Sequence, residues 1–216
     1  GARTNAAILY HNMGDMYRWD FTSNSDAMGS VYGNYQALIS RANFIIGGYD
    51  KCDMSNEMLF TPTDKAEVAN VKGEAFFIRA YSIFMLSQYF CADYNASTAT
   101  AENSGVSYRL DYAPSSSSST YPGRKTLEET FTQVKNDLDS AALYITTEGM
   151  PSNIYVSKDA ITALRARVAL AMDDYANAAA YAASLIETGT YTLAADIDEL
   201  ADLMMVSPHE VEDSIC

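Results

Sequence analysis

Helical periodicity is the feature that most constrains this sequence, because several long stretches carry it and almost none carries a sustained period of two. Residues 126–146 show it most clearly. Their apolar side chains recur at intervals of three and four: Leu127, Phe131, Val134, Leu138, Ala141, Ala142 and Ile145. Thr126 and Glu129 predict a capping box, in which hydroxyl and carboxylate each satisfy a free backbone N–H. Gly149 and Pro151 then end the helix.

Two earlier stretches carry the same period. Residues 64–91 predict a long helix entered through the sequence Thr61-Pro62-Thr63. Its expected buried face is Val68, Val71, Ala75, Ile78, Ser82, Met85 and Tyr89. Gly73 costs this helix about 1 kcal/mol relative to Ala, which predicts that another helix approaches closely there. Residues 29–46 predict a second helix, ended by Gly47 and Gly48. Its expected buried face is Val31, Tyr35, Leu38, Ala42 and Ile45.

Residues 157–189 predict a helical hairpin. Ser157 caps the first helix, the pair Asp173-Asp174 forms the turn, and Gly189 closes the second helix. Alanine occupies six of the eight positions from 176 to 183, and such small side chains let two helix backbones pack tightly. Two antiparallel helices of this length are typical of a tetratricopeptide-like unit.

Two irregular regions separate the predicted helices, at residues 14–28 and 92–125. Loops of this length are uncommon in a compact domain unless they bind something or are mobile, and we expect mobility for the serine run at 115–119. Buried apolar runs at regular spacing, which an α/β architecture needs, are not found. The predicted fold is therefore all-α. It is one domain over residues 1–216, with tetratricopeptide-like helical repeats and long irregular loops.

Charge and cysteine content exclude several classes of protein. The sequence has 28 acidic and 14 basic residues, a net charge of -14, which disfavours binding to nucleic acid or to anionic membranes. No apolar run reaches the roughly 18 to 20 residues that span a bilayer. Cys52, Cys91 and Cys216 form no CxxC pair, which excludes a disulfide framework and a zinc ribbon. At most one disulfide can form, and Cys52–Cys91 is the candidate.

The search for catalytic chemistry finds no constellation, so we expect no catalytic residues, metal or cofactor. Only two histidines occur, His11 and His209, and HExxH, GxSxG, GxGxxG and P-loop motifs are missing. Counting carboxylates leaves a glycosidase pair open. Glu74 and Arg79 are interpreted as structural, pairing with each other or with a neighbouring helix.

Aromatic residues point to a binding surface instead. Trp19 lies in the polar segment 14–28, close to Tyr17 and Asn24. The apolar C–H face of a sugar ring stacks on an indole, while amide and carboxylate groups bind its hydroxyls. The alternative is that Trp19 anchors the loop by being buried. Tyr112 and Tyr121, which flank the serine run, are weaker candidates for a second aromatic contact.

Four segments, in this order, carry a family resemblance. They are Val31 to Asn43 with its Arg-Ala-Asn ending, Lys72-Gly-Glu-Ala to Arg79-Ala-Tyr81, Arg124 to Ala142, and the hairpin region Ser157 to Leu193. Together they resemble the SusD/RagB family of bacterial nutrient-binding outer-membrane lipoproteins. After Phe90 the family usually continues Gly-x-Pro-Leu, whereas this chain reads Cys-Ala-Asp-Tyr.

The resemblance implies a helical fold on tetratricopeptide-like repeats and a glycan- or oligosaccharide-binding subunit without enzymatic turnover. It also implies delivery of the glycan to a TonB-dependent (SusC-like) transporter. The expected location is the outer face of the outer membrane, where an N-terminal lipid absent from this sequence would anchor the protein. The family's C-terminal portion is also absent, so we expect a fragment or a reduced relative.

Two other functions remain open at this point. Tetratricopeptide-like surfaces commonly hold partner proteins, so the chain could be an interaction scaffold without sugar binding. A carboxylate-pair glycoside hydrolase is the third hypothesis.

Overall fold

The computed structural model describes residues 26–56, 58–115, 117–149 and 154–205, and this part of the chain is helical, with no strand. The elements are α3 (Asp26–Lys51), α4 (Pro62–Phe90), the short 3-10 helix η1 (Ser118–Thr120), α5 (Leu127–Tyr144), α6 (Lys158–Ala171), α7 (Tyr175–Ile186) and α8 (Ile197–Met205). The all-α prediction is confirmed.

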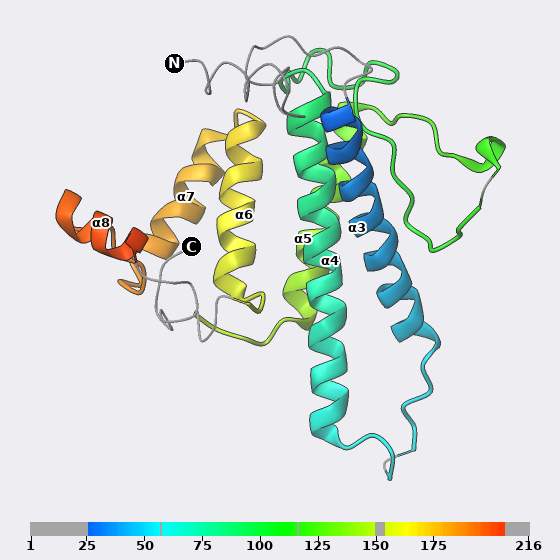
Figure 1. Ribbon diagram of the computed structural model, residues 1–216, viewed down its shortest axis with the longest axis horizontal. Helices are drawn as coiled ribbons and strands as arrows, with labels where there is room; N and C mark the ends of the chain where they lie inside the picture. Colours follow the sequence, from blue (N-terminus) through cyan, green and yellow to red (C-terminus); the bar gives the residue numbers. More distant parts are fainter. Residues whose placement is uncertain (1–25, 57, 116, 150–153, 206–216) are drawn as a thin grey trace, which may run out of the picture.

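Helices α3 to α7 pack as antiparallel neighbours in the order of the sequence (Figure 1). Helix α4 lies between α3 and α5, and α6 pairs with α7. The contact of α5 with α6 joins these two groups. This succession of helix pairs is the predicted tetratricopeptide-like arrangement.

Helix α5 follows its sequence pattern closely. Thr126 is the N-cap, and both arms of the capping box with Glu129 are formed. The predicted apolar stripe is buried, apart from the partly buried Ala142. One apolar face therefore suffices for this helix, because α5 meets the rest of the core on that side.

Helix α4 is buried on more than one side, and the predicted single face is wrong in part. Ala75 and Ser82 are buried as expected, but Val71, Ile78 and Tyr89 are exposed. The buried set instead runs around the helix: Lys72, Gly73, Ala75, Arg79, Ala80, Ser82, Ile83, Phe84, Leu86 and Ser87. A helix packed between two others has no single apolar stripe, which is why a one-sided period misassigns it.

Gly73 has the packing role that the sequence predicts. A Cβ at this position would lie 2.9 Å from Ile145 Cγ1 and 3.0 Å from Tyr144 Cβ. Beside it, Lys72 joins three helices, because its Nζ binds Asp50 Oδ1 of α3 at 2.6 Å and the Tyr144 hydroxyl of α5 at 3.1 Å. Helix α4 and the C-terminal end of α5 are therefore in close contact here.

Helix α3 is longer than predicted and turns a slightly different face inward. It continues through Gly47 and Gly48 to Lys51. Its buried side chains are Ile39, Ala42, Asn43 and Ile46. Ile45, expected inside, is 37% exposed. The glycine pair therefore does not end the helix, since both positions are compatible with helical backbone.

The hairpin forms with the predicted cap at Ser157 and the predicted turn at Asp173-Asp174, where Asp174 is also the N-cap of α7. The Ser157 hydroxyl accepts from Ala160 N, and the Asp174 carboxylate accepts from Asn177 N. Asp173 takes the left-handed backbone conformation at the turn, with φ 59°. The alanine prediction holds only in part: Ala178 is partly buried, while the other alanines from 176 to 183 are exposed.

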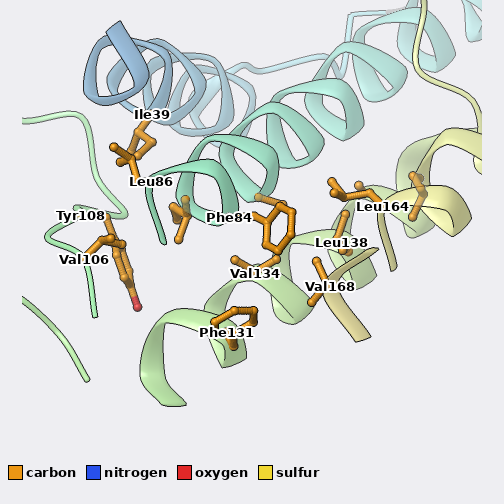
Figure 2. Close-up of a cluster of buried hydrophobic side chains, with 14 of the residues drawn as sticks. Ile39, Phe84, Leu86, Val106, Tyr108, Phe131, Val134, Leu138, Leu164 and Val168 are labelled. Carbon is orange, nitrogen blue, oxygen red and sulfur yellow. The ribbon is translucent and has the colours of Figure 1, made fainter. Parts of the chain in front are cut away.

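The core runs from α3 through α4 and α5 to α6, and the long loop contributes to it (Figure 2). Ala99, Val106 and Tyr108 of this loop are buried. Between α4 and α5 the chain is irregular apart from η1, so a loop without regular secondary structure also contributes buried side chains to the core. Hydrophobic side chains within the loop supply the burial that holds it.

Two sequence expectations concern cysteines and membrane spans. Cys52 and Cys91 are free thiols, so the candidate disulfide between them is not formed. Cys216 lies outside the described residues. In the described part of the chain, no helix combines the length and apolarity needed to cross a membrane.

Candidate functional site

A cavity of about 420 Å³ lies between α3 and the long loop. Five of its lining residues come from α3 and seven from the loop: Tyr32, Gln36, Ile39, Ser40, Asn43, Ser107, Arg109, Asp111, Ala113, Pro114, Tyr121 and Pro122. Pockets for small molecules commonly measure about 300–1,000 Å³. In Figure 1 the loop, in green, extends beyond α3 on the side away from α6 and α7.

The cavity is lined by both aromatic and polar side chains. Tyr121 is 63% exposed and Tyr32 is partly buried, with its ring edge-on to Phe90 at 5.2 Å between centroids. Gln36 and Ser40 add an amide and a hydroxyl to the α3 side. Aromatic faces beside amides and hydroxyls suit a ligand that is apolar on its faces and polar at its edges.

The charge of the cavity is balanced. Arg109 and Asp111 are the charged side chains among its described lining residues, and they form a two-pronged ion pair with 3.1 Å between Nη2 and Oδ2. The hydrogen bonds from Arg109 hold the pKa of Asp111 below its ordinary value. The cavity therefore presents no net charge to a ligand.

The first part of the loop is held against the start of α5 and the residues that lead into it. Gly105 N donates to Lys125 O at 2.8 Å, and Lys125 N donates to Val106 O at 3.1 Å. A Cβ at Gly105 would collide with the side chain of Thr130 and the backbone of Thr126, so this approach requires glycine. The loop wall of the cavity therefore starts from a fixed point.

Tyr108 anchors the same segment in the core. Its hydroxyl donates to Glu129 O of α5 at 3.2 Å, and burial raises the pKa of Tyr108 to about 12. The ring is buried and packs with the core residues of α4 and α5. A neutral, hydrogen-bonded phenol is the form that such a site favours.

A buried ion pair lies behind the cavity. Arg79 of α4 binds Asp137 of α5 through two hydrogen bonds, Nε–Oδ2 at 2.9 Å and Nη2–Oδ1 at 2.7 Å. The Arg79 Nη1 donates to Asn43 Oδ1 of α3 at 2.7 Å. Of the two pairings considered for Arg79, the one with a neighbouring helix is therefore correct. Glu74 instead accepts a hydrogen bond from Val156 N.

The structure describes two of the five predicted site residues, Tyr112 and Tyr121. Tyr121 lines the cavity, and its role as a ligand contact stays a prediction. Tyr112 is half exposed and packs edge-to-face on Phe44 of α3, with 5.0 Å between centroids, but it does not line the cavity. Tyr17, Trp19 and Asn24 lie outside the described residues.

Sequence reasoning did not assign Gln36, Asn43 or Arg79 to a site. All three lie in the segments that carry the family resemblance, which marks the positions without giving their roles. Their partners are 31 to 71 residues away in the chain. No local pattern encodes such contacts.

A second, more open groove of about 550 Å³ lies beside the first half of α4. Tyr155 is its aromatic residue and is 60% exposed. The rest of its lining comes from the first half of α4 and from residues 146 and 147. Among the described residues, no group of three or more histidine, cysteine, aspartate or glutamate side chains could hold a metal ion.

Several solved structures share this fold. A SusD superfamily protein from Bacteroides thetaiotaomicron is 24% identical, with a TM-score of 0.66 over 83% of this chain and 37% of its own. A SusD-like protein from Bacteroides fragilis is 17% identical, with a TM-score of 0.64 over 94% of this chain and 37% of its own. A SusD-like carbohydrate-binding protein from Bacteroides vulgatus is 15% identical, with a TM-score of 0.57 over 76% of this chain and 32% of its own.

The chain thus spans less than two fifths of the length of these structural relatives. No curated protein sequence matches it significantly. Residues 2–170 match the SusD-like family described as starch-binding associating with outer membrane. This match covers most of the sequence and agrees with the fold, the helix order and the motif segments. The chain belongs to the SusD-like family.

Proposed function

We propose that this chain is a glycan-binding subunit of a nutrient-uptake system and that the cavity between α3 and the long loop takes part in binding. The observation that carries the proposal is the lining of this cavity, in a chain of the SusD-like family. Tyr121 offers a ring face at the cavity, and Gln36 and Ser40 offer groups that hydrogen-bond to hydroxyls. A neutral oligosaccharide needs this combination of groups.

The proposal extends to partner and location. The ligand would pass to a TonB-dependent, SusC-like transporter, with the full-length protein held by a lipid at the outer face of the outer membrane. The description of the family as associating with the outer membrane supports this part. The Bacteroides vulgatus relative, a SusD-like carbohydrate-binding protein, supports the proposed class of ligand.

Binding without turnover is favoured over glycoside hydrolysis. A glycosidase uses two carboxylates that face one cleft, one of them free to act as an acid. Asp111 is the carboxylate among the described lining residues of the cavity, and both its oxygens accept hydrogen bonds from Arg109. This arrangement leaves the described cavity without the required pair.

The test of the proposed function is a binding screen followed by an assay for turnover. Purified protein is applied to an array of malto-, xylo-, manno- and galacto-oligosaccharides, and the strongest ligand is titrated by calorimetry. We expect saturable binding to at least one class and no release of reducing sugar on prolonged incubation. Binding to none of them contradicts the proposal and favours the hypothesis of an interaction scaffold without sugar binding. Release of reducing sugar that a single Asp or Glu substitution abolishes establishes a hydrolase.

We also propose that the segment 14–28 contributes an aromatic platform, with Trp19 as the stacking ring, Tyr17 beside it and Asn24 binding hydroxyls. Stacking on an aromatic ring is worth about 1–3 kcal/mol, by analogy with bases. Trp19→Ala should therefore weaken binding roughly 5- to 100-fold in calorimetry and leave the melting temperature nearly unchanged. A sharply lower melting temperature with intact binding identifies Trp19 as a buried anchor instead.

A further inference from the structure

Alternate backbone carbonyls of the loop wall are bound by two amide side chains of α3. Gln36 Nε2 donates to the carbonyl of Ser107 at 2.7 Å. Asn43 Nδ2 donates to the carbonyls of Arg109 at 2.9 Å and Asp111 at 3.2 Å. One edge of segment 107–111 is therefore attached to α3 throughout its length.

The two amides reach the wall at both of its ends. Gln36 and Asn43 are two helical turns apart, so they lie on one face of α3 and about 10 Å apart along its axis. Gln36 binds the wall at Ser107, and Asn43 binds it at Arg109 and Asp111.

The orientation of the Asn43 amide is fixed from behind. Its Oδ1 accepts from Nη1 of Arg79, so its Nδ2 must face the loop. Asn43 is 2% exposed and Arg79 is 5% exposed. The same Nη1 lies 3.4 Å from the carbonyl of Leu110. Water cannot readily replace the hydrogen bond between Asn43 and Arg79, because both side chains are shielded from it.

We propose that Gln36 and Asn43 are positioning residues, which hold the wall 107–111 in one arrangement and so preform the cavity before a ligand enters. This inference rests on the proposed function for its ligand. A wall without these bonds would sample several arrangements, and the binding-competent fraction would fall. The apparent affinity falls by the same factor.

Isosteric carboxylate variants test this role, because they remove the N–H donors and keep an oxygen of the same reach. Gln36→Glu and Asn43→Asp each lose the bonds to the wall. Their remaining oxygens can still accept from a ligand hydroxyl, so a direct acceptor role would survive. Asn34→Asp is the matched control, since Asn34 is exposed on the same helix and the charge change is identical.

Two measurements are made on each variant. Limited trypsin digestion with mass spectrometry follows cleavage after Arg109, within the wall. Calorimetry measures the Kd for the strongest of the malto-, xylo-, manno- and galacto-oligosaccharides. For Gln36→Glu and Asn43→Asp we expect cleavage on the order of tenfold faster and a Kd raised about fivefold or more, consistent with a smaller competent fraction. Asn34→Asp should leave both values unchanged.

Each other outcome has a definite meaning. Unchanged cleavage in both variants shows that the amides do not hold the wall, and it overturns the inference. Faster cleavage with unchanged Kd also overturns it, because the wall would then have no part in binding. Should Asn43→Asp not fold, the half-buried Gln36→Glu decides alone. If the wild-type protein binds none of the saccharides, the proposed function fails, and the cleavage rates still decide whether the wall is held.

Discussion

Arg79 and Asp137 carry opposite charges into the interior, where each depends on the other. Asp137 is 1% exposed, and its oxygens also accept from Gln133 Nε2 at 2.9 Å. Removing two charges from water costs several kcal/mol, about what their attraction and hydrogen bonds return. The pair therefore adds little net stability, but neither member can be removed alone without leaving the other unpaired.

Arg79→Met should lower the free energy of unfolding by about 3–5 kcal/mol, because it leaves a buried carboxylate without its partner. The double variant Arg79→Met/Asp137→Leu should recover at least half of this loss, since both charges are then gone. Urea unfolding followed by circular dichroism measures all variants.

The control for this prediction is Arg165→Met. Arg165 pairs with Asp139 at 2.6 Å, but the Asp139 side chain is 70% exposed, so the loss should stay below about 1 kcal/mol. Equal losses for Arg79→Met and Arg165→Met would contradict the account of a buried, interdependent pair.

Among the helices, burial follows the sequence pattern where the neighbours cover one side of a helix, and departs from it where they cover different sides. The stripe of α5 is correct because α5 buries one face. The stripe of α4 fails because α3 and α5 cover different sides of it, so polar Lys72, Arg79 and Ser87 are buried while Val71 is exposed. A periodic pattern cannot reveal how many neighbours a helix has.

The site was predictable to a smaller extent than the fold. Tyr121 could be proposed because it is an aromatic residue beside an irregular segment, and it lines the cavity. Gln36 could not, because its partner is a backbone carbonyl 71 residues away, and a carbonyl has no sequence signature. The residues that shape a loop through backbone contacts emerge only from the three-dimensional structure.

Replacing each of two helical glycines by alanine should change the free energy of unfolding in opposite directions. Gly73→Ala should destabilise the protein by about 0.5–2 kcal/mol, because the collision with Ile145 and Tyr144 outweighs the gain in helix propensity. A Cβ added at Gly33 on α3 would meet no atom within 4 Å, so Gly33→Ala should stabilise the protein by about 0.5–1 kcal/mol. Thermal and urea unfolding measure both. A gain in stability for both variants would show that α4 and α5 are not in close contact at Gly73.

The whole chain carries a net charge of -14, whereas the described cavity lining is neutral. The net charge of the chain and the neutrality of the cavity affect different classes of ligand. The long-range field repels polyanions and is screened by salt, with a Debye length of about 10 Å at 0.1 M. An uncharged saccharide experiences only the local contacts of the cavity.

The affinity for neutral oligosaccharides should therefore not depend on the salt concentration. The affinity for acidic oligosaccharides should be low, and it should rise as the salt concentration is raised. The comparison uses galacto- and galacturono-oligosaccharides of equal length, titrated at about 20 mM and about 300 mM NaCl, which bracket strong and weak screening. Tight binding of the acidic series at low salt would contradict a neutral site.

The most direct test of the cavity as a glycan site compares two tyrosines of matched exposure. Tyr121 is 63% exposed and lines the cavity, and Tyr155 is 60% exposed in the separate groove beside α4. Calorimetric titration with the strongest neutral oligosaccharide is carried out on Tyr121→Ala, Tyr155→Ala and the wild-type protein. The account predicts a Kd raised roughly 5- to 100-fold for Tyr121→Ala, the loss of one stacking ring, and an unchanged Kd for Tyr155→Ala. An unchanged Kd for Tyr121→Ala, or a loss confined to Tyr155→Ala, would contradict it.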